Sequence, residues 1–304
     1  MSDSAAPSLS IIIVASHQSR GILRACLQSI QRETPHASYE VIVSDNATTD
    51  DCPAMLREEF PSVRVLANGS NLGFARGNNR ALAIATGHWV CLLNSDTIVH
   101  EQALERMAAY LKTHPEIGVL GCRLLNPDGS LQLSCYDFPS LREVWMGLTG
   151  LHRLASRPCL DPTATHRVDW VMGACLMLER AWATTLQGFD ETYAIYGEDL
   201  DLCYRSTKEG RPAAYLGDAR ITHLGNQTAG QRWNDMQRNL RKYEAQCLFW
   251  RTHYPRWQSV LYRLLMGFGA AVRWILYTIG GLIYAPWRTR RAMQVATVQL
   301  MWGW

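Results

Sequence analysis

Polar side chains that can bind a cation or move a proton follow apolar or strand-like runs in this sequence. Asn94-Ser95-Asp96 comes directly after the run 89–93, which is typical of a buried strand. In an open α/β sheet, ligands bind beyond the carboxyl ends of the strands. A carboxylate at that place can hold Mg²⁺ or Mn²⁺ against the diphosphate of a nucleotide. The acidic pair Glu198-Asp199 and His223 suit the same kind of site, with the pair as the source of a general base.

The elements that must position these side chains alternate between strand and helix in the first half of the chain. Residues 10–14, 39–44 and 89–93 are strand-like runs, and residues 21–31 carry apolar side chains at helical spacing. Strands separated by helical segments of about ten or more residues indicate a parallel sheet with right-handed crossovers. Further strands are expected at 63–66 and 117–121, and further helices at 50–60, 74–85 (closed by Gly87) and 100–112.

The pattern changes after about residue 122. Asn126-Pro127-Asp128-Gly129 is a turn signal, and residues 134–167 are expected to form an irregular, loop-rich connection over the site. Trp170–Leu178 is expected to be one strand that contains Gly173. The remaining expected elements are a helix at 198–209, strands at 213–216 and 221–223, and helices from about residue 226 onward.

Five motifs occur in an order that resembles a known family. The sequence is similar to family-2 glycosyltransferases with a GT-A fold over residues 8–225, and most similar to their rhamnosyltransferase-like branch. The resemblance implies an α/β, GT-A (Rossmann-like) fold with a mixed, mostly parallel sheet flanked by helices. It also implies an inverting, metal-dependent transfer of a sugar from a nucleotide diphosphate. The motifs span residues 10–14, 41–46, 71–79, 92–96 and 197–205.

Residues 94–96 stand where the family has its D-x-D motif. Asn94 replaces the first Asp, which leaves Asp96 as the stronger metal ligand. His223 stands where family members often have a histidine near the metal or the diphosphate. The resemblance therefore implies Asp96 and His223 as metal ligands. The alternatives are an aspartate that caps the next helix and a structural histidine.

Glu198-Asp199 matches the family's acidic pair before a helix. An inverting transfer needs a base within hydrogen-bond reach of the acceptor hydroxyl. We expect Asp199 to be that base and Glu198 to orient or bind the acceptor; the alternative is charge complementarity with the helix N-terminus. Trp170 and Gly173 lie on the acceptor side, where Trp170 either stacks on a sugar or fills the core. Asp201 is expected to be structural.

The resemblance also implies a nucleotide-binding site. A carboxylate at Asp45 accepts hydrogen bonds from the base or ribose. Arg76 is expected to pair with the diphosphate or groups near the base. Gly73 and Gly77 permit close approach of backbone to phosphate. The alternatives are a turn cap at 45–46 and a surface arginine. The nucleotide-binding residues are expected to be Ser16, Asp45, Asn46, Arg76, Asn79 and Ser95.

Charge divides the 304-residue chain into two parts. Residues 1–225 carry 19 Lys and Arg against 25 Asp and Glu, whereas residues 226–304 carry 11 against 2 and hold seven of the 11 tryptophans. We therefore expect a catalytic domain over 1–225 and a basic helical extension over 226–304 that lies on an anionic membrane surface. A membrane-spanning helix in this extension would place Arg263 and Arg273 in lipid, which is costly. The alternatives are a helical bundle packed on the main domain, or on a second subunit in a homo-oligomer.

The expected partners follow from these two parts. They are a nucleotide-sugar donor, plausibly dTDP-rhamnose, and a glycan or polyprenyl-diphosphate-linked acceptor in cell-envelope polysaccharide synthesis. The protein is expected to be a peripheral membrane protein on the cytoplasmic face of the inner (plasma) membrane. Interleaved Leu, Ile and Trp in the extension favour lipid over nucleic acid.

The sequence leaves two alternative functions to consider. A sugar-nucleotide pyrophosphorylase needs a Gly-rich first loop with basic residues, which residues 16–20 do not supply. A non-catalytic, membrane-bound scaffold with a GT-A fold is the main alternative, and the presence of both carboxylates at 198–199 speaks against it. The nine cysteines have no regular spacing, so Cys91, Cys122 and Cys175 are expected to be packed apolar residues in a reducing compartment.

Overall fold

The computed structural model describes residues 7–149, 162–225, 234–280 and 286–302 of the chain. The chain divides into two compact units. The first comprises Met1–Phe138, Pro158–Ala194 and Glu198–Gln231, and the second comprises Pro139–Arg157, Ile195–Gly197 and Arg232–Trp304.

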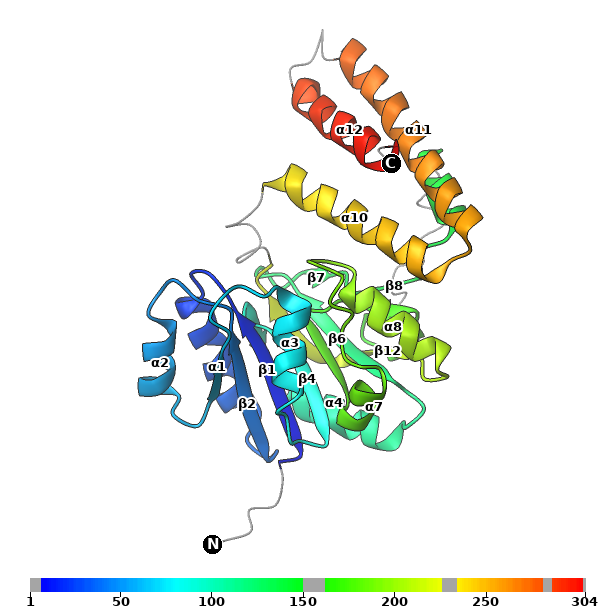
Figure 1. Cartoon of the computed structure of the whole chain (residues 1–304). Coiled ribbons are helices and arrows are strands. Elements are labelled where there is room, and N and C mark those ends of the chain that lie inside the picture. Colours follow the sequence, from blue (N-terminus) through cyan, green and yellow to red (C-terminus); the bar gives the residue numbers. More distant parts are fainter. Residues whose placement is uncertain (1–6, 150–161, 226–233, 281–285, 303–304) are drawn as a thin grey trace, which may run out of the picture. The chain divides into compact units, whose positions relative to one another are not determined.

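A ten-stranded mixed sheet forms the centre of the first unit (Figure 1). Eight of its strands follow the order β3-β2-β1-β4-β11-β6-β12-β5, with β7 paired to β6 and β9 paired to β12. The neighbours β3-β2, β2-β1, β1-β4 and β6-β12 are parallel, whereas β11 runs antiparallel to β4 and β6. The strands are β1 Leu9–Ala15, β2 Tyr39–Asp45, β3 Arg64–Ala67, β4 Trp89–Asn94, β5 Thr97–Val99, β6 Val119–Leu125, β7 Leu131–Gln132, β9 His166–Val168, β11 Cys175–Glu179 and β12 Ala213–His223.

The carboxyl ends of β1, β2 and β4 meet at one edge of this sheet. Ala15 is paired with Asp45, and Val14 with Asn94. Because parallel strands place their carboxyl ends together, the residues that follow them share this edge. Ser16, Asn46 and Ser95 therefore lie at one edge although they are about 30 to 80 residues apart in sequence.

Helices cover both faces of the sheet. This cover is needed because successive side chains of β1 point to opposite faces and are apolar on both. Ile11 and Ile13 pack in one core cluster with α1, α2 and α4. Ile12, on the other face, packs in a second cluster with α3, α7 and α8. The helices are α1 Arg20–Glu33, α2 Cys52–Glu59, α3 Phe74–Leu82, α4 Ala103–Thr113, α7 Arg180–Thr185 and α8 Glu198–Lys208. The mixed, mostly parallel sheet flanked by helices agrees with the fold class expected from the sequence.

The cysteines of this unit are packed apolar side chains. Cys91, Cys122 and Cys175 are buried in the first core cluster, as expected. All eight cysteines in the described part of the chain are free.

Four expected elements differ from the structure. Trp170–Leu178 is two strands, β10 Trp170–Val171 and β11, because the chain leaves a small sheet with β8 (Cys135–Tyr136) and enters the large one at Cys175. The helix expected from residue 100 begins at Ala103, and the strand β5 precedes it. Gly87 does not close α3, which ends at Leu82.

Gly87 instead lies against the backbone of β1, where a Cβ would come within 2.5 Å of the Ser10 nitrogen. The segment expected to be irregular, 134–167, includes α5 Leu141–Leu148, whose capping box joins Ser140 and Glu143. Residues 150–161 of that segment lie outside the described residues.

The second unit is helical in its described part. It contains α5, α10 Asp235–His253, α11 Arg256–Gly280 and α12 Pro286–Trp302. Its core gathers Trp250, Tyr262 and Met301. Within the described residues, α11 is the helix long and apolar enough to cross a membrane, and 28% of its most apolar 18-residue window is buried.

Candidate functional site

The structure brings Asp96 and His223 together. The short strand β5 pairs with the end of β12 and sets His223 opposite Thr97, directly after Asp96. The Leu224 backbone N–H donates to the Asp96 carbonyl at 2.9 Å and closes this corner. His223 Nε2 lies 3.4 Å from Asp96 Oδ1, and the two side chains are 13% and 8% exposed. A carboxylate and an imidazole nitrogen, 127 residues apart in sequence, thus face each other at the sheet edge.

Gln132 fixes the orientation of His223. Gln132 Nε2 donates to Asn126 Oδ1 at 2.9 Å, which turns the amide oxygen toward His223 Nδ1 at 2.7 Å. The network thereby places a proton on Nδ1 and leaves Nε2 as the ring nitrogen that faces Asp96. A partner on the second ring nitrogen is the usual arrangement for a metal-binding histidine. Gln132 was not identified from the sequence, because its partner is 91 residues away.

The donor set at this corner is small. Asn94 Nδ2 lies 3.4 Å from His223 Nε2, so it faces the same ring nitrogen. No group of three or more His, Cys, Asp or Glu side chains in the described part of the chain is arranged to hold a metal ion. Mg²⁺ and related cations in nucleotide sites commonly take one or two protein ligands, with phosphate and water supplying the rest. Asp96 and His223 match that limited contribution.

Glu198 and Asp199 begin α8 and have different surroundings. Both oxygens of Asp199 accept backbone N–H groups, Oδ2 from Gly173 and Oδ1 from Leu200, each at 2.8 Å. Glu198 is buried, and its Oε2 has no hydrogen-bond partner among the described residues. Burial, with the adjacent Asp199 carboxylate second, raises the pKa of Glu198 to about 8. Burial also raises the pKa of Asp199, but its two backbone N–H donors oppose that shift, so the proton of the pair lies mainly on Glu198 at neutral pH.

The connection between β10 and β11 links Asp199 to the end of β4. The Asn94 backbone N–H donates to the Ala174 carbonyl at 2.9 Å, and the preceding residue, Gly173, donates to Asp199. A Cβ at Gly173 would lie 3.3 Å from Asp199 Oδ2, tighter than most such contacts. Two consecutive residues, Gly173 and Ala174, thus link the end of β4 to the start of α8. This geometry places residues 94–96 and Asp199 in one neighbourhood.

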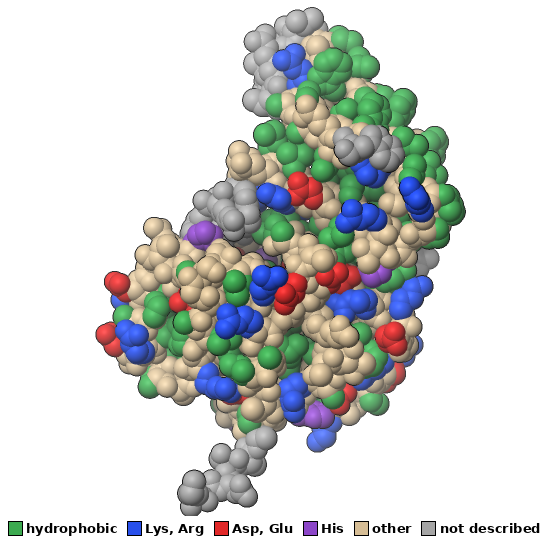
Figure 2. Space-filling model, viewed as in Figure 1, with side chains coloured by type: hydrophobic (Ala, Val, Ile, Leu, Met, Phe, Trp, Pro, Cys, Tyr) green, Lys and Arg blue, Asp and Glu red, His purple; other side chains and the backbone are tan. Residues whose placement is uncertain are grey.

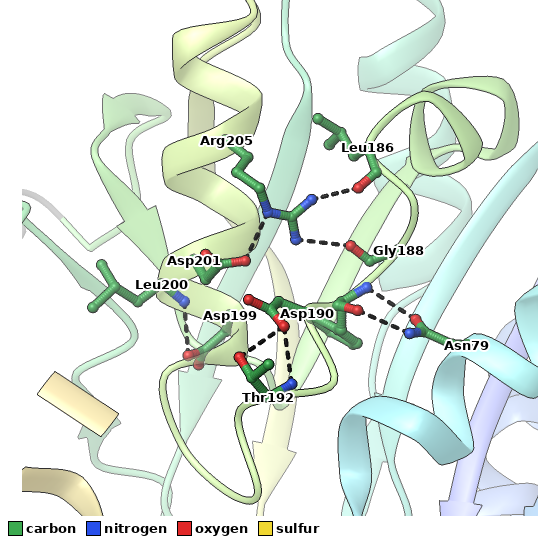
Figure 3. A network of polar contacts seen from close by, with 10 residues as sticks. Asn79, Leu186, Gly188, Asp190, Thr192, Asp199, Leu200, Asp201 and Arg205 are labelled. Atoms are coloured by element: carbon green, nitrogen blue, oxygen red, sulfur yellow. Dashed lines mark hydrogen bonds and ion pairs between the residues drawn. The ribbon is translucent and has the colours of Figure 1, made fainter. Parts of the chain in front are cut away.

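Asp201 and Arg205 form a separate structural clamp (Figure 3). Arg205 Nε donates to the buried Asp201 Oδ2 at 2.7 Å. The same guanidinium donates to the carbonyls of Leu186 and Gly188, and so holds the loop between α7 and α8. The Asp201 carboxylate thus serves this clamp, which is consistent with the structural role expected for it.

Asp45, expected to bind the nucleotide, ends β2, and Asn46 follows it. Asp45 Oδ1 accepts the backbone N–H of Thr48 at 2.9 Å, which is the turn cap weighed as an alternative. Asn46 is buried; its amide donates to the Gly73 carbonyl and its oxygen accepts Asn68 Nδ2. Asn46 therefore fastens the 71–79 motif to the sheet edge.

Arg76 and Asn79 both contact the loop that precedes α8. Arg76 Nε donates to Glu191 Oε2 at 2.8 Å on the surface. Asn79 donates to the Phe189 carbonyl and to Glu191, and its oxygen accepts the Phe189 N–H. The Asn79 amide is thus fully used within the chain. An exposed ion pair such as that of Arg76 is weak, about 0–1 kcal/mol, and a phosphate can replace it.

Gly77 has a packing role in this motif. A Cβ at Gly77 would lie 3.1 Å from Val14 Cγ1 and 3.3 Å from Asn46 Nδ2. Its close approach is therefore to the ends of β1 and β2. Gly73, with φ of +86°, precedes α3 in the left-handed region that favours glycine.

Trp170 stacks on a tyrosine that the sequence did not single out. The rings of Trp170 and Tyr136 lie 4.5 Å apart with 21° between their planes. Trp170 Nε1 donates to the Asp137 carbonyl at 3.0 Å, which fixes the indole. Burial, with the Asp199 carboxylate second, raises the pKa of Tyr136 to about 12, so this ring lies near the acidic pair. An alternating aromatic pattern at 136 and 138 was the available signal.

Comparisons with known proteins agree with this arrangement. The model of "Glycosyl transferase family 2" matches residues 10–152, and that of "Glycosyl transferase family group 2" matches residues 89–304. The N-acetylglucosaminyl-diphospho-decaprenol L-rhamnosyltransferase of Mycobacterium tuberculosis is 28% identical over 228 residues, which are 67% of this chain and 71% of that protein. The rhamnosyltransferase WbbL of Escherichia coli is 25% identical over 226 residues, 71% of this chain and 83% of that protein.

Solved structures share the fold. A mannosyltransferase from Pyrobaculum calidifontis, solved with GDP-Man and Mn²⁺, superposes with a TM-score of 0.61 at 18% identity, over 99% of this chain and 88% of that one. The glycosyltransferase GalNAc-T7, solved with UDP, GalNAc and Mn²⁺, gives a TM-score of 0.55 at 18% identity, over 73% of this chain and 44% of that one. The chain belongs to glycosyltransferase family 2, with a GT-A fold and a rhamnosyltransferase-like sequence.

Proposed function

We propose that this glycosyltransferase is inverting and metal-dependent, and that it moves L-rhamnose from dTDP-rhamnose to a glycan or polyprenyl-diphosphate-linked acceptor. One observation carries the mechanism: Asp96, His223 and Asp199 are joined at one edge of the sheet through the contact of β4 with Gly173-Ala174. The donor and acceptor classes are supported by the names of the rhamnosyltransferase relatives.

Asp96 and His223 are the residues proposed to hold Mg²⁺ or Mn²⁺. A cation bound there would neutralise the charge that develops on the leaving diphosphate. The His223 lone pair and the Asp96 carboxylate face each other at 3.4 Å, and Gln132 keeps the imidazole in the metal-binding tautomer.

The donor is proposed to lie along the carboxyl edge of β1, β2 and β4. Ser16 and Ser95 follow β1 and β4 there, and Asp45 offers a carboxylate to the base or ribose. Asn46 supports this edge by holding Gly73. Arg76 would exchange Glu191 for the diphosphate. We leave Asn79 out, because its amide is used by Phe189 and Glu191.

Asp199 is proposed to remove the proton of the acceptor hydroxyl. Two backbone N–H groups hold its carboxylate in one orientation while each oxygen keeps a further lone pair. Glu198, protonated at neutral pH, would donate a hydrogen bond to the acceptor from Oε2. Trp170 would offer its ring to the acceptor sugar, and the absent side chain at Gly173 keeps space beside Asp199.

The helical extension is proposed to hold the enzyme peripherally on the cytoplasmic face of the inner membrane. Exposed apolar side chains gather on α11, where Trp257, Phe268 and Ile279 are each about 60% exposed. Figure 2 shows hydrophobic side chains collected over this helical unit. Arg263 and Arg273 bond to Met301 and Gln294 of α12, so they point to the neighbouring helix and not to that apolar face. An amphipathic face of this kind favours surface binding over a span.

The donor test uses full-length protein with Mn²⁺ or Mg²⁺, a detergent-dispersed polyprenyl-diphosphate-linked acceptor and a panel of nucleotide sugars. We expect dTDP release from dTDP-rhamnose, dependent on the cation, and no comparable release from UDP-sugars. The measurement is chromatography of free nucleoside diphosphate. Release from a different donor would correct the sugar only, whereas no release from any donor would favour the non-catalytic scaffold.

Gln132→Leu is expected to weaken Mn²⁺ binding in the presence of dTDP by about 10- to 100-fold. The change leaves His223 Nδ1 without its acceptor and frees the ring to rotate. Gln132→Glu keeps an oxygen at that place and is the matched control that should retain binding. Electron paramagnetic resonance of free Mn²⁺ measures the Mn²⁺ affinity of both variants. Equal affinity of the Leu variant and the wild type would show that Gln132 does not position the imidazole.

A further inference from the structure

Arg123, in the middle of β6, is a partly buried arginine without a partner. Its Nε atom is buried and has no hydrogen-bond partner, and the side chain forms no ion pair or ring contact within the described part of the chain. By contrast, Arg205 of α8 pairs with Asp201. Buried donors in folded proteins are nearly always bonded, so an exception calls for an explanation.

The face of β6 that carries Arg123 is the face that α8 covers. Val119 of β6 belongs to the second core cluster, which also gathers residues of α8. Side chains alternate along a strand, so Gly121 and Arg123 share that face with Val119. A Cβ at Gly121 would come within 2.6 Å of Val171 Cβ in β10, which agrees with this direction. Arg123 therefore lies on the side of the sheet that carries α8 and β10.

Arg123 also lies near the end of the sheet that holds the proposed active site. Both β4 and β6 are antiparallel to β11, so they run in the same direction and their carboxyl ends share one edge. Continued two residues past Gly121, the register between β6 and β11 leads to Arg123 and Ala174. Ala174 directly follows Gly173, whose N–H donates to Asp199. An unpaired guanidinium thus lies beside the connection that holds the proposed base.

A guanidinium in this place suits an anion with several oxygens. Arginine offers five N–H donors in a planar fork that matches phosphate. The diphosphate of the donor is proposed to lie on the cation at Asp96 and His223, whereas Arg123 shares its face with β10, which carries Trp170 on the acceptor side. Where an acceptor sugar is attached to a polyprenyl diphosphate, a second diphosphate lies one sugar ring away from the hydroxyl that Asp199 is proposed to deprotonate.

We propose that Arg123 binds the diphosphate of a polyprenyl-diphosphate-linked acceptor. The inference rests on the proposed function and names the residue that recognises the lipid-linked form of the acceptor. It accounts for the unpaired guanidinium, because the counter-charge arrives with the substrate. Arg123, Gly173 and Asp199 all belong to the first unit, so the site is contained in one compact body.

The test measures the binding of farnesyl diphosphate, a short polyprenyl diphosphate, to the full-length protein whose donor site is filled with dTDP and Mn²⁺. We expect Arg123→Gln to weaken this binding by about 10- to 100-fold, because a hydrogen bond between charged groups is lost. The affinity for dTDP with Mn²⁺ should stay unchanged. Arg167→Gln, which removes the same charge from an exposed arginine of β9, is the matched control. Isothermal titration calorimetry measures both affinities.

Thermal stability separates this role from a structural one. Removal of an unpaired, partly buried cation relieves its desolvation cost, so Arg123→Gln should melt at the wild-type temperature or above it. Arg205→Gln should melt lower, because it leaves the buried Asp201 carboxylate without its cation. A lower melting temperature of Arg123→Gln with unchanged affinity for farnesyl diphosphate would make Arg123 a structural residue and overturn the proposal.

The other outcomes are distinct. Weaker dTDP binding in Arg123→Gln would place the diphosphate of the donor on this arginine and overturn the assignment to the acceptor. An equal loss in Arg167→Gln would reduce the effect to net charge, and no binding of farnesyl diphosphate to the wild type would also overturn the proposal. Release of dTDP from dTDP-rhamnose, measured in the same preparations, reports separately on the transferase.

Discussion

Asp199→Asn is expected to leave nucleotide binding intact and to lower sugar transfer by about 10²- to 10⁴-fold, the usual contribution of a general base. The carboxamide has one oxygen where the carboxylate has two, so one of the N–H groups of Gly173 and Leu200 loses its acceptor. That loss costs about 1–3 kcal/mol of stability in addition to the lost basicity. The measurements are dTDP affinity by calorimetry, initial rate of transfer and melting temperature.

Glu198→Gln is the informative companion of this variant. The pKa of Glu198 is raised to about 8, so the wild-type side chain is neutral near pH 7 and glutamine reproduces its charge and shape. We expect the rate to fall by about tenfold at most, because a hydrogen-bond donor is kept. Asp218→Asn, at an exposed carboxylate, sets the baseline for a surface change.

The reverse ranking would reassign the base. If Glu198→Gln abolished transfer while Asp199→Asn kept it, Glu198 would be the base and Asp199 its structural neighbour. The two carboxylates differ in a way that allows either result: within the described part of the chain Glu198 Oε2 has no partner, whereas both Asp199 oxygens are held by the backbone.

The parts of the fold with local signals were predictable from the sequence. The strand-like runs at 10–14 and 39–44 lie in β1 and β2, because the centres of strands buried on both faces are apolar. The capping box Ser140-x-x-Glu143 was also a local signal, and it marks the start of α5 where an irregular connection was expected. The helix α5 was therefore predictable from these residues, and the expectation of an irregular connection overlooked this signal.

Other features depend on contacts between distant residues and had no local signal. Trp170–Leu178 is a continuous apolar run that reads as a single strand, yet Gly173 turns its N–H to Asp199 and the chain changes sheets there. The three-residue strand β5 is too short for a pattern, and it is what brings His223 to Asp96. Gln132 and Tyr136 gain their roles only from partners that the fold supplies. Residue types therefore indicated candidates for the site, but not the supports that orient them.

Asp96→Asn is expected to lower transfer by about 10³-fold and to abolish the cation dependence of donor binding, because loss of a metal's charge stabilisation costs several kcal/mol in the transition state. The variant should still fold, since the Asp96 backbone carbonyl keeps its bond to the Leu224 N–H. Mn²⁺ titration in the presence of dTDP, with transfer rates at saturating Mn²⁺, measures both effects. Wild-type Mn²⁺ affinity in this variant would remove Asp96 as a ligand.

Asn94→Asp supplies the opposite change at the same corner. Asn94 Nδ2 lies 3.4 Å from His223 Nε2, so a carboxylate there adds a hard oxygen donor on the side of the imidazole lone pair. We expect tighter Mn²⁺ binding, by about tenfold, because a second anionic ligand raises the affinity of such a site. If the cation is held by Asp96 and His223, the affinities must rank Asn94→Asp above wild type and wild type above Asp96→Asn. Any other order would mean that the cation binds away from this corner, because only there do the three side chains meet.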